Sequence, residues 1–202
     1  MNPLLKCSAL VFLLTVSMVV YSQKTALLII DIQEVYFPGG GLTLENPEEA
    51  GMNAGLLLQH FRQTGQLVIH VKHNVNKGGK IHEFVAPRDE EILVVKDDIN
   101  AFKGTRLRDI LVKSGVERLV ICGMQTHMCV EAATRAASDM GYSCIVVSDA
   151  CTTRALQYGP VIVPAKEVHY ATLSTLAGYY ADVLTTDEYL RSMVEASYRK
   201  SD

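Results

Sequence analysis

The stretch ERLVICGMQTHMCVEAATRAASDMGYSCIVVSDA, residues 117–150, contains two short apolar runs with a helical pattern between them. The runs at 117–123 and 142–150 read as strands, and the segment that opens near Cys129 and stops at Gly141 reads as a helix. Continuous apolar character is typical of strands that are covered on both faces. The stretch therefore predicts two parallel strands joined by a crossover helix.

The same alternation of strands and helices extends along the chain on both sides of this unit. Further strands are predicted at 25–31, 66–71, 91–95 and 181–185, and further helices at 46–65, 105–115, 165–180 and from 186 onward. Alternating strands and helices are typical of a parallel sheet with helices on its faces. We therefore predict a Rossmann-like, three-layer α/β/α fold whose mainly parallel sheet has roughly six strands.

Length, composition and charge restrict the class of protein. The chain has 202 residues, of which 49% are hydrophobic and 20% are charged, and this is typical of one globular domain. The formal net charge is −3, and no cluster of Lys and Arg is present. Because nucleic-acid binding needs a basic face, we expect a small-molecule partner and no nucleic acid.

The first 22 residues have the composition of a secretory signal peptide. They contain one Lys, an apolar run at 9–20, and small or polar residues after it. The run is shorter than the about 20 apolar residues of a membrane span. We therefore expect export to the periplasm or the medium, a domain at 23–202, and no stable membrane insertion after cleavage. An uncleaved membrane anchor is the alternative.

Three reactive residues follow predicted strands or open the helix after one. Asp31 and Lys96 come directly after strands, and Cys129 lies near the start of a helix. Ligands bind beyond the carboxyl ends of parallel strands, so these side chains are expected to converge. A helix start and a cation favour a thiolate, and a carboxylate can accept the thiol proton. Each residue alone has an ordinary role in a turn, a surface or a core, but together they predict a cysteine nucleophile.

Longer motifs around these residues resemble a known family. ALLIIDIQEVYF (26–37), VVKDDINAFKGTRL (94–107) and the stretch at 115–151 resemble the isochorismatase-like cysteine hydrolase superfamily, which includes nicotinamidases and related amidases. The most specific part is Gly-x-x-Thr-x-x-Cys-Val at 123–130, and the resemblance spans residues 25–190. It implies an isochorismatase-like fold and a cysteine hydrolase that needs no cofactor.

The resemblance also implies a set of catalytic groups. It maps Asp31, Lys96 and Cys129 onto the family's catalytic triad and places a cis peptide bond between Met124 and Gln125. The backbone N–H groups of Gln125 and Cys129 would form an oxyanion hole. The expected reaction cleaves a C–N bond of a small amide or imide through a thioester on Cys129. Asp31 would protonate the leaving nitrogen.

Several residues near these motifs are candidates for substrate binding. Phe37 and Phe102 flank the strand-end residues and, together with Tyr36, could form the walls of a pocket for a flat substrate. The alternative role of the aromatic residues is core packing. Gln125 and His127 precede Cys129 and are expected to line the pocket, although His127 could instead cap the helix start.

The chain departs from the nicotinamidases in the segment after the second strand. These relatives bind a metal there through an Asp and closely spaced histidines. Here His70, His73 and His82 are present, but the Asp-x-His step is missing and Val75 takes the place of a ligand. Because a metal site needs several ligands in one geometry, we predict that no metal is bound.

Two other functions remain open from the sequence. The family also hydrolyses vinyl ethers such as isochorismate, a reaction that does not need a thiol nucleophile. A small-molecule-binding protein that keeps the fold without turnover is the alternative from a different class. Because relatives form dimers and larger assemblies, a homo-oligomer is also expected.

Overall fold

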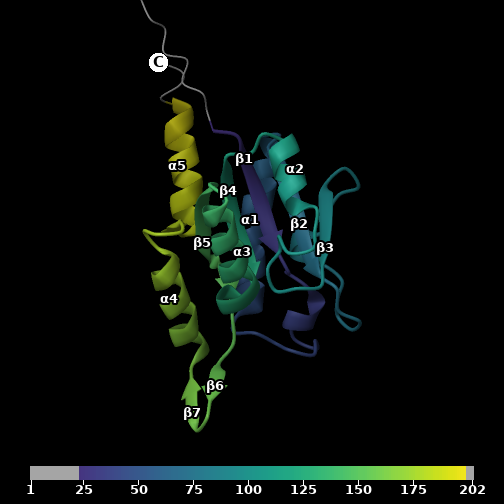
Figure 1. The fold of residues 1–202 in the computed structure, drawn as a ribbon, viewed down its shortest axis with the longest axis vertical. Helices are drawn as coiled ribbons and strands as arrows, with labels where there is room; N and C mark the ends of the chain where they lie inside the picture. The colour runs from purple at the N-terminus through teal and green to yellow at the C-terminus, as the bar shows by residue number, and fades with distance from the viewer. Residues whose placement is uncertain (1–22, 199–202) are drawn as a thin grey trace, which may run out of the picture.

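A single parallel sheet forms the centre of the protein (Figure 1). The computed structural model describes residues 23–198, so the predicted signal peptide at 1–22 lies outside the described residues. The six strands run in the order β3-β2-β1-β4-β5-β8, and all neighbours are parallel. Their bounds are β1 Thr25–Ile30, β2 Leu67–His73, β3 Ile92–Lys96, β4 Arg118–Met124, β5 Ser143–Thr152 and β8 Asp182–Leu184.

Helices cover both faces of the sheet, which confirms the predicted three-layer α/β/α fold. They are α1 Pro47–Gln63, α2 Leu107–Lys113, α3 Glu131–Asp139, α4 Ala165–Leu176 and α5 Thr186–Tyr198. Figure 1 shows α2 and α3 in front of the strands and α1 behind them. Helix α1 packs with α5, and α3 packs with α4. In the described part of the chain, every helix is too short or too polar to cross a membrane.

Strand β1 is the most deeply buried element and explains the apolar run near the start of the domain. Every residue from Ala26 to Ile30 is at most 2% exposed. The strand pairs with β2 on one side and with β4 on the other. The connection after β1 leads to β2 on one side, and the connection after β4 leads to β5 on the other side. Because the two connections run in opposite directions, a crevice opens at the carboxyl ends of β1 and β4.

Two features differ from the sequence prediction. A small antiparallel hairpin, β6 Leu156–Tyr158 and β7 Val161–Val163, was missed, although a glycine and a proline between two apolar runs are a turn signal. Figure 1 shows it extending away from the sheet. Helix α4 also ends at Leu176, earlier than predicted, because Gly178 has a φ of 79° and redirects the chain.

Gly123 allows β1 and β4 to lie close together beside the crevice. Its φ is 136°, and an added Cβ would lie 1.9 Å from the carbonyl oxygen of Ile30. We predict that Gly123→Ala lowers the free energy of unfolding by about 3 kcal/mol or more, because both the backbone and the neighbouring strand must move. Urea denaturation followed by circular dichroism measures the change.

Gly65 provides a matched control for this substitution. Its φ is 65°, but an added Cβ would meet nothing within 4 Å. Gly65→Ala should therefore cost only about 1 kcal/mol, from the left-handed backbone alone. Equal losses in the two variants would show that the close approach of the strands is unimportant.

Candidate active site

Asp31 turns its carboxylate into the crevice directly after β1. Its φ of 51° is in the left-handed region, which Asp adopts more readily than most residues. Its N–H donates to the carbonyl oxygen of Val71 at 2.9 Å, which ties the turn to β2. The side chain is fully buried, and Oδ2 lies 2.7 Å from Nζ of Lys96. A local backbone turn thus brings this carboxylate to the ammonium group.

Lys96, the last residue of β3, is the centre of the site. Its Nζ lies 2.7 Å from Asp31 Oδ2, 2.9 Å from His73 Nδ1, 3.1 Å from the carbonyl oxygen of Asp98 and 3.3 Å from Cys129 Sγ. An ammonium group has three N–H donors, so four acceptors compete for them. The structure therefore brings the three predicted triad residues into direct contact and adds His73 to them.

Cys129 lies in a wide helical turn rather than at the start of an α-helix. The turn is a π-helix, Thr126–Val130, which continues directly into α3. The carbonyl oxygen of Gln125 accepts from the N–H of Met128 at 3.0 Å and from that of Val130 at 3.3 Å. The second bond spans five residues, as in other π-helical turns, which are frequent at functional sites. The helical segment therefore begins before Cys129 and surrounds it.

The protonation of Cys129 differs from the sequence expectation. Burial and then the nearby Asp31 carboxylate raise the pKa of Cys129 to about 12, and the Lys96 ammonium only partly opposes them. Burial also raises the pKa of Asp31, although Lys96 lowers it. The direction of the pKa shift is therefore opposite to the one expected from the helix start and the cation. Asp31 is the neighbouring group that can accept the thiol proton.

Gln33 holds the backbone of His73 beside the triad. Its Oε1 accepts from the His73 N–H at 2.8 Å, and its Nε2 donates to the His73 carbonyl oxygen at 3.0 Å. Its Nε2 also donates to the carbonyl oxygen of Gly79 at 2.9 Å, which ties the following loop to the same point. The glutamine of the Asp-x-Gln motif therefore fixes the end of β2 next to Lys96.

The predicted histidines lie in three different surroundings. His70 contacts Glu91 at 2.9 Å, His73 contacts Lys96, and the ring of His82 stacks on that of Phe37. They therefore do not share one site. Ligand atoms of Asp31, His73 and Cys129 do lie within 4.8 Å of one another. The ammonium of Lys96 contacts all three groups, so a cation already lies at this point.

Sequence reasoning missed the contact of His73 with Lys96, although a signal was present. The two residues are register partners at the carboxyl ends of β2 and β3. The strand-end argument that selected Asp31 and Lys96 therefore applies equally to His73.

Tyr36 and Gln125 form a second buried pair at the triad. Burial raises the pKa of Tyr36 to about 12, a hydrogen bond with Gln125 partly opposes this, and the negative charge of Asp31 raises it further. Gln125 is 4% exposed, and its Oε1 has no hydrogen-bond partner among the described residues. The Met124–Gln125 peptide bond is cis, as the resemblance implied. A free acceptor is thus available beside the reactive groups.

The other predicted pocket residues occupy different positions. The ring of Phe37 stacks on that of His82 with centroids 3.6 Å apart and meets Phe84 edge-on, so one of its faces is already covered. Phe102 is buried in the loop after Lys96. Their substrate-binding roles stay predictions.

His127 packs toward the end of β5. Its Nδ1 forms a hydrogen bond with Oγ1 of Thr153. Burial and then the positive charge of Arg154 lower the pKa of His127. The hydrogen bond ties the ring to the segment that follows β5. Arg154, which sequence reasoning did not select, therefore lies close to the loop that carries Cys129.

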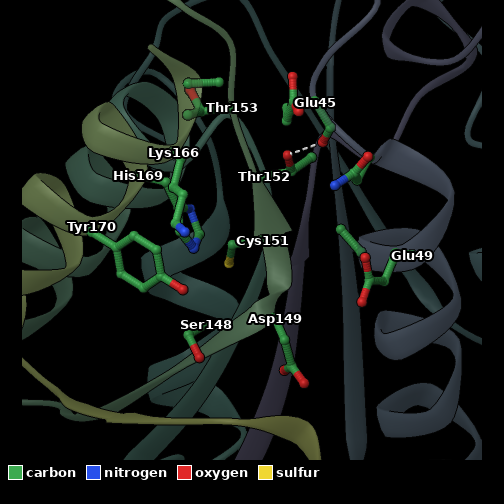
Figure 2. Close-up of a pocket in the computed structure, with 13 residues that line it drawn as sticks. Glu45, Glu49, Ser148, Asp149, Cys151, Thr152, Thr153, Lys166, His169 and Tyr170 are labelled. Atoms are coloured by element: carbon green, nitrogen blue, oxygen red, sulfur yellow. Dashed lines mark hydrogen bonds between the residues drawn. The ribbon is translucent and has the colours of Figure 1, made fainter. Parts of the chain in front are cut away.

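A separate pocket of about 280 Å³ lies beside the end of β5 (Figure 2). Figure 2 shows His169 and Tyr170 pointing from α4 toward Cys151, with Glu49 on α1 across from them. None of the triad residues lines it. It is linked to the triad loop because Nδ1 of His169 forms a 2.8 Å hydrogen bond with Oγ1 of Thr126. A residue that lines the pocket is therefore tied to the turn that contains Cys129.

The fold and this arrangement define an α/β/α hydrolase with a buried cysteine, and comparisons with known proteins identify the family. Residues 25–188 match the model of the isochorismatase domain. The isochorismatase family protein YddQ of Bacillus subtilis is 48% identical over 84% of this chain and 100% of the relative. Maleamate amidohydrolase of Pseudomonas putida is 26% identical over 86% of this chain and 88% of the relative.

A solved structure agrees with the sequence comparisons. An isochorismatase hydrolase from Oleispira antarctica superimposes with a TM-score of 0.80 and 41% sequence identity. The match covers 84% of this chain and 97% of the other chain. The chain belongs to the isochorismatase family of hydrolases.

The balance of charges predicts how Cys129 reacts with iodoacetamide. Because the Asp31 carboxylate raises the pKa of Cys129, Asp31→Asn should lower that pKa and increase the thiolate fraction. We expect alkylation at about pH 8 to be at least about tenfold faster in Asp31→Asn than in the wild type. The wild-type rate should keep rising with pH, because the pKa of Cys129 is raised. Mass spectrometry of the peptide that contains Cys129 measures both rates, and Cys129→Ala is the control. Equal rates in the two proteins would contradict this account.

Proposed function

We propose that the protein hydrolyses the C–N bond of a small amide or imide through a thioester on Cys129. The observation that supports this is the contact of the Lys96 ammonium with both the Asp31 carboxylate and the Cys129 sulfur in a buried site. A nucleophile, a base and a fixed positive charge are the groups that acyl transfer needs. One relative is a maleamate amidohydrolase, and this agrees with the proposed chemistry.

The first step forms the carbon–sulfur bond. Cys129 attacks the amide carbonyl while its proton passes to Asp31, which is neutral as a result. The Lys96 ammonium, freed from its ion pair, stabilises the sulfur as charge develops on it. We assign the oxyanion of the tetrahedral intermediate to the backbone N–H groups of Gln125 and Cys129. The high pKa of the thiol means that proton transfer and attack occur together.

The second half of the reaction hydrolyses the thioester and returns the site to its starting state. Asp31 gives the proton to the leaving nitrogen, the C–N bond breaks, and ammonia or an amine departs from the thioester. Water then attacks the thioester carbonyl while Asp31 accepts its proton. Collapse of this intermediate releases the carboxylic acid and returns the proton to Cys129. The raised pKa of Asp31 suits a group that is protonated in the middle of the cycle.

The test compares wild type and Cys129→Ala on amides, imides and isochorismate. The panel contains the half-amides and diamides of short dicarboxylic acids and their cyclic imides. Because the sulfur forms the covalent bond, we expect Cys129→Ala to lose at least about a thousandfold in ammonia release from amides or in imide ring opening. Intact-mass measurement of quenched wild-type protein should show an acyl adduct on Cys129.

Two results would contradict the proposal. Consumption of isochorismate at equal rates by wild type and Cys129→Ala would indicate vinyl-ether hydrolysis by Asp31 without the thiol. Binding of the compounds by wild type without turnover or adduct would indicate a binding protein.

A further inference from the structure

His169 connects helix α4 to the turn that contains Cys129. Its Nδ1 lies 2.8 Å from Oγ1 of Thr126, which is the first residue of the π-helical turn and is completely buried. Helix α4 also packs against this turn. Within residues 23–198, the Thr126 hydroxyl has no second hydrogen-bond partner, so this bond alone holds it in place.

The surroundings of the imidazole favour a neutral ring. Burial lowers the pKa of His169, and no carboxylate of the described chain forms an ion pair with it. A neutral imidazole has one nitrogen that donates and one that accepts, so Nδ1 forms a single directed hydrogen bond with the hydroxyl. The ring lines the pocket beside β5, where Figure 2 shows it pointing toward Cys151. It therefore reaches the turn from the side of this pocket.

The turn carries the two backbone N–H groups to which we assign the oxyanion. Gln125 precedes Thr126, and Cys129 follows it by three residues. The carbonyl oxygen of Gln125 accepts from the N–H groups of Met128 and Val130, so a displacement at the start of the turn passes to the rest of it. An oxyanion hole requires donors at fixed positions, and a shift of about 1 Å can cost about a hundredfold in rate.

A second side chain ties the neighbouring residue of the turn to another element. Nδ1 of His127 forms a hydrogen bond with Oγ1 of Thr153, which directly follows β5. Thr126 is thus tied to α4, and His127 is tied to the segment after β5. Two ties from different elements restrict the turn more than one does. Loss of the bond to His169 should therefore leave the turn attached but less precisely placed.

We propose that His169 is a positioning residue that holds the N–H groups of Gln125 and Cys129 in place through its bond to Thr126. It acts through Thr126 and not by contact with the reacting atoms. Because a hydrogen bond between uncharged groups contributes modestly to folding, its loss should affect the rate more than the stability. This inference rests on the proposed amide hydrolysis, in which the oxyanion forms.

The test removes the bond from each side. His169→Leu deletes the partner of Thr126, and Thr126→Val deletes the hydroxyl but keeps the shape of the side chain. We expect each variant to lose about tenfold to a hundredfold in kcat for ammonia release, with KM changed less than about threefold, because the oxyanion forms only after binding. The double variant should lose no more than either single variant, because both changes remove the same bond.

Two further variants test whether the effect comes from this bond. His169→Asn can place an amide group near the position of Nδ1, so it should keep kcat within about threefold of wild type. Thr172→Val removes another buried hydroxyl of α4, whose 2.9 Å bond goes to the carbonyl oxygen of Val168 in the same helix. It should leave kcat unchanged. A loss in Thr172→Val as large as that in His169→Leu would indicate general damage to α4 and overturn the inference.

A measurement without turnover separates this inference from the proposed function. A small aldehyde such as butyraldehyde adds to the thiol of Cys129: the sulfur bonds to the carbonyl carbon, and the thiol proton passes to the oxygen, which then lies at the oxyanion site. Protection of Cys129 from iodoacetamide by the aldehyde should be about tenfold weaker in His169→Leu and Thr126→Val. Alkylation without aldehyde should proceed at the wild-type rate, because Asp31 and Lys96 are unchanged.

The combined results distinguish the two proposals. Protection that depends on His169, without hydrolysis of any amide, would support the positioning role and contradict the proposed reaction. Hydrolysis of an amide with unchanged kcat and unchanged protection in both variants would overturn the inference and leave amide hydrolysis in place. Slower alkylation without aldehyde in both variants would also overturn it, because His169 would then support the thiol itself. If His169→Leu does not fold, Thr126→Val decides the result.

Discussion

The burial of one ammonium group is the constraint on which the site depends. Lys96 is 1% exposed, and a charge in such a place is stable only when it is surrounded by acceptors. The sheet supplies them from neighbouring strand ends: Asp31 after β1, His73 at the end of β2, and Cys129 in the turn after β4. The carboxylate, the imidazole and the sulfur are therefore close together because the buried ammonium group of Lys96 needs acceptors.

Burial also decides the charge state of the nucleophile. In water, a cation beside a thiol favours the thiolate, but desolvation disfavours every charged form and here outweighs the cation. The raised pKa values of Cys129 and Asp31 have this common cause. The sulfur and the carboxylate thus both contact the same ammonium group. In the hydrolysis we propose, this arrangement links nucleophilic attack to proton transfer.

The sequence by itself determined the order of strands and helices and the strand-end positions of Asp31 and Lys96, because apolar runs and helical periods are local patterns. It also placed Cys129 near a helix start, although it did not show the π-helical turn, in which the carbonyl oxygen of Gln125 accepts from the N–H groups of Met128 and Val130. Only the tertiary structure decided the contact of His73 with Lys96 and the burial that raises the pKa of the Cys129 thiol. These depend on burial and on residues far apart in the chain, which no local pattern records.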